Sequence, residues 1–297
     1  MPGLTLSQVA ELELVQGSKF YPLLAGSEPD DRYEASGVAV RGEHLIVIFE
    51  DTPHVARIHR TLTPDHPDSR LFRQMTPIHG YVDISYDAQG KRFFLLGEAR
   101  KDPVGNKQKP VINQFAYDFL YLDQDWVDFP EDGKDNQLGG LSYIRRDDQD
   151  YLLATCAGNL CLGGRKGKQP GGGRLLIFQN KGQIWALREK LELPKHVAFR
   201  NYVNVAIRGN RLAILSQETS ALWICELSDS EWRFTSDGQV YRFPTNNSGE
   251  QAYCNLQGID WMDDDHIVAV SGRRKGRQNR ICGEKDQSVH LFRIPGQ

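Results

Sequence analysis

The chain has 297 residues, of which 39% are hydrophobic and 25% are charged, a composition that supports a buried core and excludes a disordered protein. The formal net charge of −3 excludes a general attraction to nucleic acid or to an anionic membrane, so any such attraction has to come from local clusters. The sequence has no apolar run of about eighteen residues, the length that a membrane-spanning helix needs.

The N-terminal segment carries Glu11 and Glu13 and lacks the basic start and continuous apolar run of a secretory signal. We therefore expect a soluble, cytoplasmic protein. Within this segment, residues 9–15 alternate apolar and polar side chains with period two, which predicts a β-strand.

A unit of three or four short strands recurs five times along the chain. Each copy has a four-residue strand, a polar turn of the kind that β-hairpins use, and a longer apolar strand. The first strands are residues 37–40, 83–86, 140–143, 204–207 and 258–261. The second strands are residues 44–48, 93–96, 151–154, 212–215 and 267–270. A third strand follows in four copies, at residues 55–58, 175–178, 221–224 and 289–292.

Repeats of about fifty residues, each with three or four antiparallel strands, predict an all-β fold. We expect a single β-propeller over residues 1–297 with five four-stranded antiparallel blades. The last copy has room for only three strands, and residues 9–15 would supply its fourth strand and close the ring. Residues 16–33 fall outside this scheme, which leaves six blades as the alternative.

The last copy also carries a family resemblance. Its strand Gln257-Gly258-Ile259-Asp260-Trp261, followed by Asp263-Asp264-Asp265-His266-Ile267-Val268-Ala269-Val270, resembles the blades of the phytase-like esterase family and related bacterial propellers. The resemblance implies a propeller fold in a family where some members depend on metal and some act on phosphate esters. Because this chain has no acidic signature repeated at equivalent positions, no ligand or catalytic residue is transferred from that family.

Polar residues gather at one rim of the predicted ring, because antiparallel first strands begin where second strands end. Those before the first strands are Tyr33, Glu34, His79, Gly80, Asn136, Gln137, Arg200, Asn201, Cys254 and Asn255. Those after the second strands are Glu50, Glu98, Ala157, Gln217 and Gly272. Many of these residues carry side-chain oxygen atoms, which suit calcium, with Glu34, Glu50 and Glu98 as candidate ligands. The same oxygen atoms suit hydrogen bonding to a polar substrate. Alternatively, these residues only satisfy backbone groups and water.

Three long loops reach the same rim, at residues 98–110, 158–174 and 271–287, and they carry fourteen of the 36 basic residues, Lys107 among them. The glycine-rich segment 163–173 exposes amides beside cations, a combination that can hold an oxyanion, although no P-loop follows. A solvated loop is the alternative interpretation. The candidate ligand-binding residues are Arg100, Arg165, Lys166, Arg200, Asn201, Gln217, Asn255, Arg273 and Arg274.

The five cysteines are an odd number in a chain too large to need disulfides, so we expect free thiols. Cys156, Cys161 and Cys282 lie in or beside basic loops, where redox-active, bridged or metal-bound thiols are the alternatives.

The sequence thus predicts a propeller that binds a small phosphorylated, sulfated or carboxylated molecule at a basic rim over its central channel. One alternative is a metal-dependent phosphate-ester hydrolase that uses the cation to activate water. The other is a scaffold for a protein partner. Nucleic acid is disfavoured because the loops lack interleaved aromatic residues, and no nucleophile elbow supports a serine hydrolase.

Overall fold

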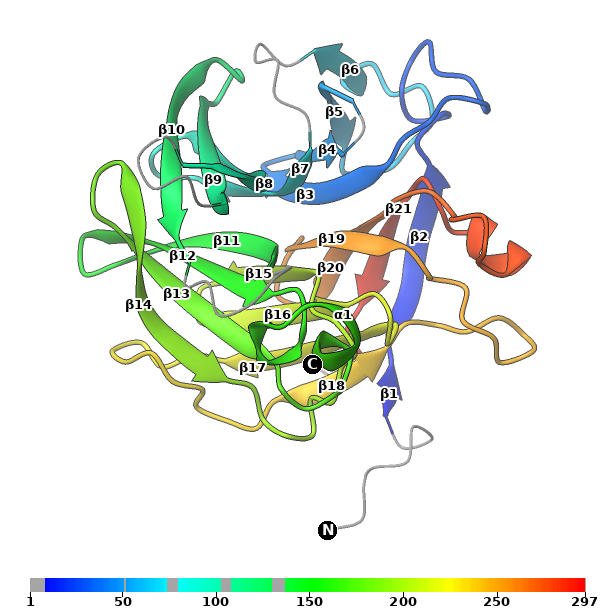
Figure 1. The fold of residues 1–297 in the computed structure, drawn as a ribbon. Helices are drawn as coiled ribbons and strands as arrows, with labels where there is room; N and C mark the ends of the chain where they lie inside the picture. The colour runs from blue at the N-terminus through cyan, green and yellow to red at the C-terminus, as the bar shows by residue number, and fades with distance from the viewer. Residues whose placement is uncertain (1–8, 51, 74–79, 103–107, 130–136, 297) are drawn as a thin grey trace.

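Almost all of the regular secondary structure consists of β-strands (Figure 1). It is a computed structural model that describes residues 9–50, 52–73, 80–102, 108–129 and 137–296. Helical segments in these ranges are short, namely η2 (Asn159–Cys161), α1 (Gly164–Gly167) and η3 (Arg280–Gly283). The all-β prediction is therefore confirmed. None of these helices is long and apolar enough to cross a membrane.

The strands form four hydrogen-bonded sheets. One contains β3 (Ala35–Arg41), β4 (His44–Phe49), β5 (His54–His59) and β6 (Arg70–Arg73). A second contains β15 (Asn204–Arg208), β16 (Arg211–Ser216), β17 (Ala221–Glu226), β18 (Gln239–Arg242) and β1 (Ala10–Glu11). A third contains β19 (Leu256–Trp261), β20 (His266–Ser271), β21 (Ser288–Arg293) and β2 (Glu13–Lys19). All predicted first, second and third strands lie within observed strands.

The fourth sheet has eight strands and joins two groups of four. The first group is β7 (Tyr81–Asp87), β8 (Arg92–Lys101), β9 (Gln108–Ala116) and β10 (Tyr121–Asp128). The second group is β11 (Leu138–Arg146), β12 (Gln149–Cys156), β13 (Arg174–Asn180) and β14 (Ile184–Glu192). They meet where β10 and β14 pair in parallel, and β7 also packs on β11, so this sheet is a nearly closed barrel.

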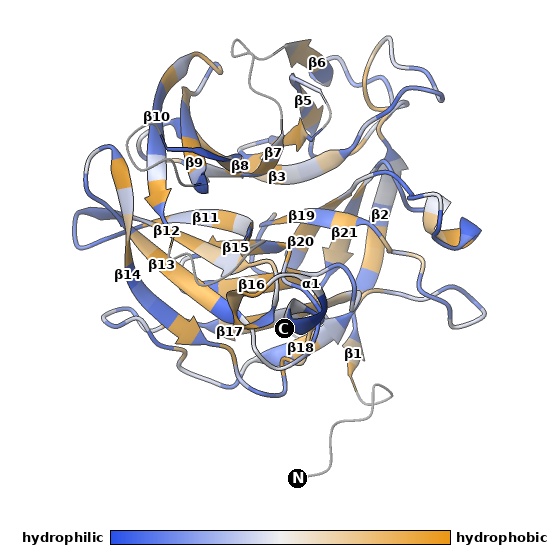
Figure 2. Cartoon of the chain, viewed as in Figure 1, coloured by the Kyte–Doolittle hydropathy of each residue, from blue (hydrophilic) through white to orange (hydrophobic). Residues whose placement is uncertain are grey.

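The second strands form the apolar centre of each group because they are covered on both faces. In β4, every side chain from Leu45 to Phe49 is at most 1% exposed. The cores lie between neighbouring groups, where for example Ile46 and Ile48 pack with Phe93 and Leu95. Figure 2 shows the orange colour of hydrophobic residues along second strands such as β16.

The first strands β3, β7, β11, β15 and β19 pack in a ring, with β19 beside β3. The approach is close, since a Cβ atom on Gly258 would lie 2.7 Å from the Gly37 Cα. Side chains bridge from strand to strand. The accepting and donating pairs are Asp83 with the Leu141 N–H at 2.7 Å, Ser142 with Ile207 at 3.1 Å, Asn204 with Ile259 at 3.3 Å, and Asp260 with Val40 at 2.7 Å. The glycines of the repeat thus allow the first strands to approach closely at the axis, and its Asp, Ser and Asn side chains accept hydrogen bonds from the backbone of the next first strand.

The N-terminal segment supplies the fourth strand of the last sheet, as expected, although at a different position. The pairing strand is β2, residues 13–19, instead of residues 9–15, and it lies antiparallel to β21 (Figure 1). Ala10 and Glu11 instead pair in parallel with β18 of the neighbouring sheet. Leu12, between the two strands, is buried in the core, so the segment spans two sheets. No strand lies between Lys19 and Ala35.

The expectation of free thiols is wrong for four of the five cysteines. Disulfides join Cys156 to Cys161 and Cys254 to Cys282, with Cα–Cα distances of 5.0 and 5.4 Å. Cys225 is a buried free thiol whose pKa is raised by burial. An odd number of cysteines requires only that one of them has no disulfide partner. The pairing of Cys254 with Cys282 could not be expected from the sequence, because the fold brings these two residues together from separate loops.

Candidate functional site

We define the upper rim as the end of the ring where first strands begin and second strands end. The pairing of Ala35 with Phe49 and of Leu256 with Ser271 confirms this common edge. The Gly272 N–H also donates to the Asn255 carbonyl at 2.9 Å, just outside the last of these pairs. The rim predicted from the sequence therefore exists.

A cavity of about 510 Å³ lies at the upper rim, among the connections that precede β15 and β19 and follow β16 and β20. This volume is in the range of small-molecule sites. The residues that line it are charged or carry side-chain amides, apart from two cysteines, and they are Arg200, Gln217, Glu218, Glu250, Gln251, Cys254, Asn255, Lys275, Gln278, Asn279 and Cys282. Three of the predicted ligand-binding residues, Arg200, Gln217 and Asn255, are thus brought together.

The backbone that carries Arg200 is held on both sides. The Arg200 N–H donates to the Thr219 hydroxyl at 3.0 Å, and Asn159 Nδ2 donates to the Arg200 carbonyl at 3.4 Å. Asn159 is 1% exposed and also accepts from the Gly172 N–H at 2.8 Å. The guanidinium of Arg200 therefore extends from a fixed main chain.

The glycine-rich loop folds around Asn159 and is not an open cradle for an oxyanion. Its glycines permit close packing, since a Cβ atom on Gly158 or Gly167 would lie 2.1 or 1.9 Å from the Leu162 carbonyl oxygen. The Gly167 and Gly172 amides donate within the loop, to the Gly163 carbonyl and to Asn159. Arg165 and Lys166 lie exposed on α1 and do not line the cavity.

The opposite wall is the loop after β20. Asn255, which is 2% exposed, exchanges two hydrogen bonds with the Gln278 amide, at 3.0 and 2.7 Å. Gln278 Oε1 also accepts from the Lys275 N–H at 2.6 Å, and the Cys254–Cys282 disulfide joins the same two segments. These contacts fix the backbone of Lys275 beside the cavity.

The charged groups of the cavity differ in their partners. Glu218 forms an ion pair with Lys168 at 2.8 Å. Glu250 accepts from the side-chain amides of Asn246 and Asn279, at 3.1 and 3.4 Å. Within the described ranges, no hydrogen bond or ion pair engages the Arg200 guanidinium or the Lys275 ammonium group. Two positive charges therefore remain available to a ligand.

The other predicted ligand-binding residues lie outside the cavity. Arg100 is exposed in the β8–β9 hairpin, opposite Lys109. Asn201 Oδ1 accepts from the Ser216 hydroxyl and the Glu218 N–H, both at 2.9 Å, and so shapes the loop after β16. Arg273 is exposed, whereas the Arg274 guanidinium donates to the Gln278 carbonyl at 3.1 Å. The three basic loops therefore do not form one site. Lys107, His79 and Asn136 lie outside the described residues.

Several lining residues are not predictable from the sequence pattern. Lys275 belongs to the third basic loop but was not selected from its cations, and Glu250, Gln278 and Asn279 carried no signal. The lining residues that the sequence predicts lie near strand ends, as Arg200, Gln217 and Asn255 do, because their position depends on the strands and not on the loop conformation.

The predicted calcium ligands share the upper rim. Their main chains are linked, since the Glu50 N–H donates to the Glu34 carbonyl at 2.9 Å and the Glu98 N–H to the Gly80 carbonyl at 3.0 Å. Across the described part of the chain, no three His, Cys, Asp or Glu residues gather as metal ligands would. Calcium at Glu34, Glu50 and Glu98 stays a prediction.

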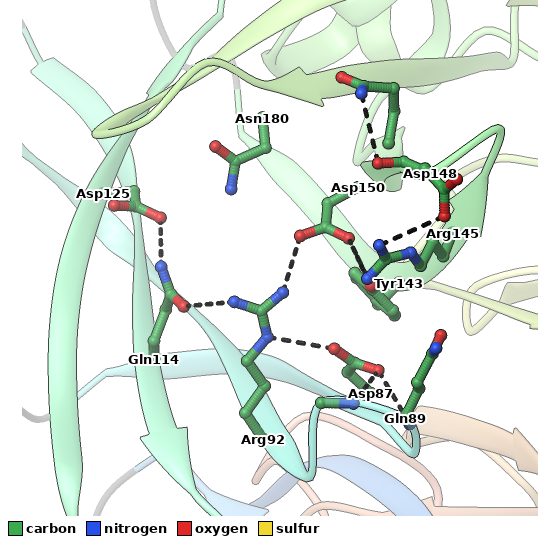
Figure 3. Close-up of polar contacts among 12 residues, drawn as sticks. Asp87, Gln89, Arg92, Gln114, Asp125, Tyr143, Arg145, Asp148, Asp150 and Asn180 are labelled. Atoms are coloured by element: carbon green, nitrogen blue, oxygen red, sulfur yellow. Dashed lines mark hydrogen bonds and ion pairs between the residues drawn. The ribbon is translucent and has the colours of Figure 1, made fainter.

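A second polar cluster lies between the two halves of the eight-stranded sheet (Figure 3). At its centre, Arg92 donates to Asp87 at 3.1 Å, to Asp150 at 2.7 Å and to Gln114 at 3.4 Å. Gln114 in turn donates to Asp125 at 2.6 Å, and burial raises the pKa of that carboxyl group. The cluster satisfies its own members, so we interpret it as a contact that joins β8 and β9 to β12.

Comparisons with known proteins place the fold in a class. No protein-family model and no curated protein sequence matches the chain. Glutaminyl cyclase from Myxococcus xanthus has a similar structure, with a TM-score of 0.55 and 11% identity over 96% of this chain and 98% of that one. A luciferin-regenerating enzyme has a TM-score of 0.52 and 8% identity, covering 95% of both chains. PQQ-bound aldose sugar dehydrogenase from Streptomyces coelicolor has a TM-score of 0.48 and 13% identity, over 94% of this chain and 98% of that one.

The protein therefore has a β-propeller-like, all-β fold. At such low identities the likeness concerns the fold alone, and activity does not transfer with it. The resemblance to the phytase-like esterase family stays a prediction, since the structures named above are different propeller-like proteins.

Proposed function

We propose that the protein binds a small anionic molecule in the upper-rim cavity, through Arg200 and Lys275. One observation carries this proposal. In the described protein the side chains of Arg200 and Lys275 have no hydrogen-bond or ion-pair partner, whereas the carboxylates of Glu218 and Glu250 both have partners. Charged hydrogen bonds to an anion would satisfy these cations and are stronger than neutral ones. Phosphorylated, sulfated and carboxylated ligands all fit this chemistry.

The experiment compares two double variants by titration calorimetry at low salt, against phosphate esters, sulfated sugars and small carboxylates. Arg200→Gln with Lys275→Gln should weaken binding at least about tenfold, the effect of removing charged hydrogen bonds. The matched control is Arg165→Gln with Lys166→Gln, which removes the same charge from the same rim outside the cavity and should bind as the natural protein does.

Two results would count against the proposal. Equal losses in both variants would favour a diffuse basic rim over the cavity. If the natural protein bound none of the three ligand classes, anion binding would be wrong altogether.

We further propose that the domain has five blades. Five first strands pack in a ring, and each belongs to a group of four strands if β7–β10 and β11–β14 are counted separately. On this count the parallel pairing of β10 with β14 is a contact between two blades.

The two disulfides favour an oxidising compartment over the expected cytoplasm, where thiols are kept reduced. Thiol alkylation under denaturing conditions, followed by mass spectrometry, should label Cys225 alone. Labelling of all five cysteines would show that the disulfides are absent and would instead favour a reducing compartment.

A scaffold function is favoured by one separate feature, the β9–β10 hairpin. Tyr117, Leu120, Tyr121 and Leu122 are each between 37% and 56% exposed, and clustered apolar side chains of this kind mark interaction sites. Leu120→Asp should abolish any co-purifying partner, whereas Ile184→Asp, at another exposed apolar position, should not. Retention of the partner by the first variant would remove this hairpin from the account.

A further inference from the structure

Glu250 gives the cavity a negative charge that no cation of the described ranges neutralises. Glu218 pairs with Lys168, whereas the partners of Glu250 in the described chain are two neutral amides. One amide donates to each carboxylate oxygen, so the group is held in one orientation. A carboxylate has about four acceptor positions, which leaves Glu250 able to accept from a ligand.

The charges of the cavity are also separated from one another. No ion pair joins Glu250 to Arg200 or to Lys275 among the described contacts, although all three line the same space of about 510 Å³. A compact dianion such as sulfate or selenate could bind the two cations but would leave Glu250 without a partner from the ligand. A ligand with a positive and a negative end could engage all three groups.

We infer that the ligand is a small zwitterion of the amino-acid type, whose carboxylate binds Arg200 and Lys275 and whose ammonium group donates to Glu250. This inference rests on the proposed function and adds the class of ligand. The amine carries at least one N–H, because the residues that line the cavity include no aromatic side chain and quaternary ammonium ions are recognised by aromatic cages. The body of the ligand is small and polar, since amide side chains such as Gln217 and Gln251 supply the surrounding wall.

The test uses pairs of compounds that share the carboxylate and the side chain, one with a charged ammonium group and the other with a neutral amide in its place. Serine, asparagine and aspartate are titrated into the protein beside their N-acetyl derivatives, which keep the carboxylate and lose the ammonium charge. At least one free amino acid should bind about tenfold or more tightly than its N-acetyl partner, the strength of one charged hydrogen bond. Glu250→Gln should abolish this preference while leaving the N-acetyl compound bound as well or better.

Glu284→Gln is the matched control, because Glu284 is exposed in the loop between β20 and β21, which carries Lys275 and Gln278, but does not itself line the cavity. It should keep the preference for the free amine. Both glutamates are exposed, so neither substitution should unfold the protein, and melting curves would verify this.

The outcomes separate the two proposals. If N-acetyl derivatives or phosphate esters bind at least as tightly as free amino acids, and Arg200→Gln weakens them, the anion site stands and the zwitterion is wrong. A preference that survives Glu250→Gln would also overturn the inference. If no carboxylate or other anion binds the natural protein, the proposed function itself fails.

Discussion

Asp260 lies within the ring of first strands and should make stability depend on pH. Its carboxylate accepts from the Val40 N–H at 2.7 Å and the Trp261 N–H at 2.8 Å. Burial nevertheless raises its pKa from 3.8 to about 6, against the effect of these hydrogen bonds. Because the folded chain holds the proton more tightly than the unfolded chain, this stabilisation is complete below pH 3.8 and is lost as the pH rises through about 6.

The magnitude follows from the shift. Each pKa unit corresponds to about 1.4 kcal/mol, so the change from 3.8 to about 6 amounts to at most about 3 kcal/mol. Asp260→Asn keeps the volume and one acceptor but cannot ionise. The variant removes the ionisation of Asp260 and with it the charge that helps to raise the pKa of Asp83, so the difference between the two proteins reports the two carboxyl groups together.

The assay is urea denaturation of both proteins at pH 4, 5, 6 and 7. The natural protein should lose up to about 3 kcal/mol relative to Asp260→Asn between pH 4 and pH 7. His290, whose pKa is lowered to about 3 by burial, works in the opposite direction but is present in both proteins. A stability difference that stays constant across this range would refute the raised pKa of Asp260.

Three further predictions concern the ring, the loops and calcium. Gly258→Ala should cost about 1–3 kcal/mol of overpacking against Gly37, whereas Gly276→Ala, with open space around it, should not; equal stabilities would contradict the close approach. Replacing Cys254 and Cys282 by serine should cost about 3–4 kcal/mol in urea denaturation, as expected for a closed loop of 28 residues, and an unchanged midpoint would contradict it. If the upper rim binds calcium, the melting temperature should rise with calcium and fall back with chelator, and identical curves would remove the metal.

Much of the fold follows from local patterns in the sequence. The apolar run 44–48 and its counterparts predict buried second strands, and residues such as Gly258 and Asp83 mark where first strands approach. The parallel contact of β10 with β14 could not be predicted, because it depends on how two outer strands bend in space. The strand that pairs with β21 begins at residue 13 instead of residue 9, because Leu12 is buried between two sheets and Ala10 and Glu11 pair with the neighbouring sheet.

The site was predictable only where strands determine it. Asn255 directly precedes β19 and Arg200 lies a few residues before β15, so their place at the rim follows from the repeat. Loop cations were counted correctly, but counting charges does not show which of them face a cavity. Lys275 does so because Gln278 and a disulfide hold its loop, while Lys166 extends from a helical turn into solvent.

The position of a bound anion is the most direct test of the central claim. Crystals grown with selenate, an anion that anomalous scattering locates, should show it in the cavity within hydrogen-bonding distance of Arg200 and Lys275. The same soak of crystals of Arg200→Gln with Lys275→Gln should leave that position empty. Selenate bound instead along residues 163–173, with none in the cavity of the natural protein, would contradict the account.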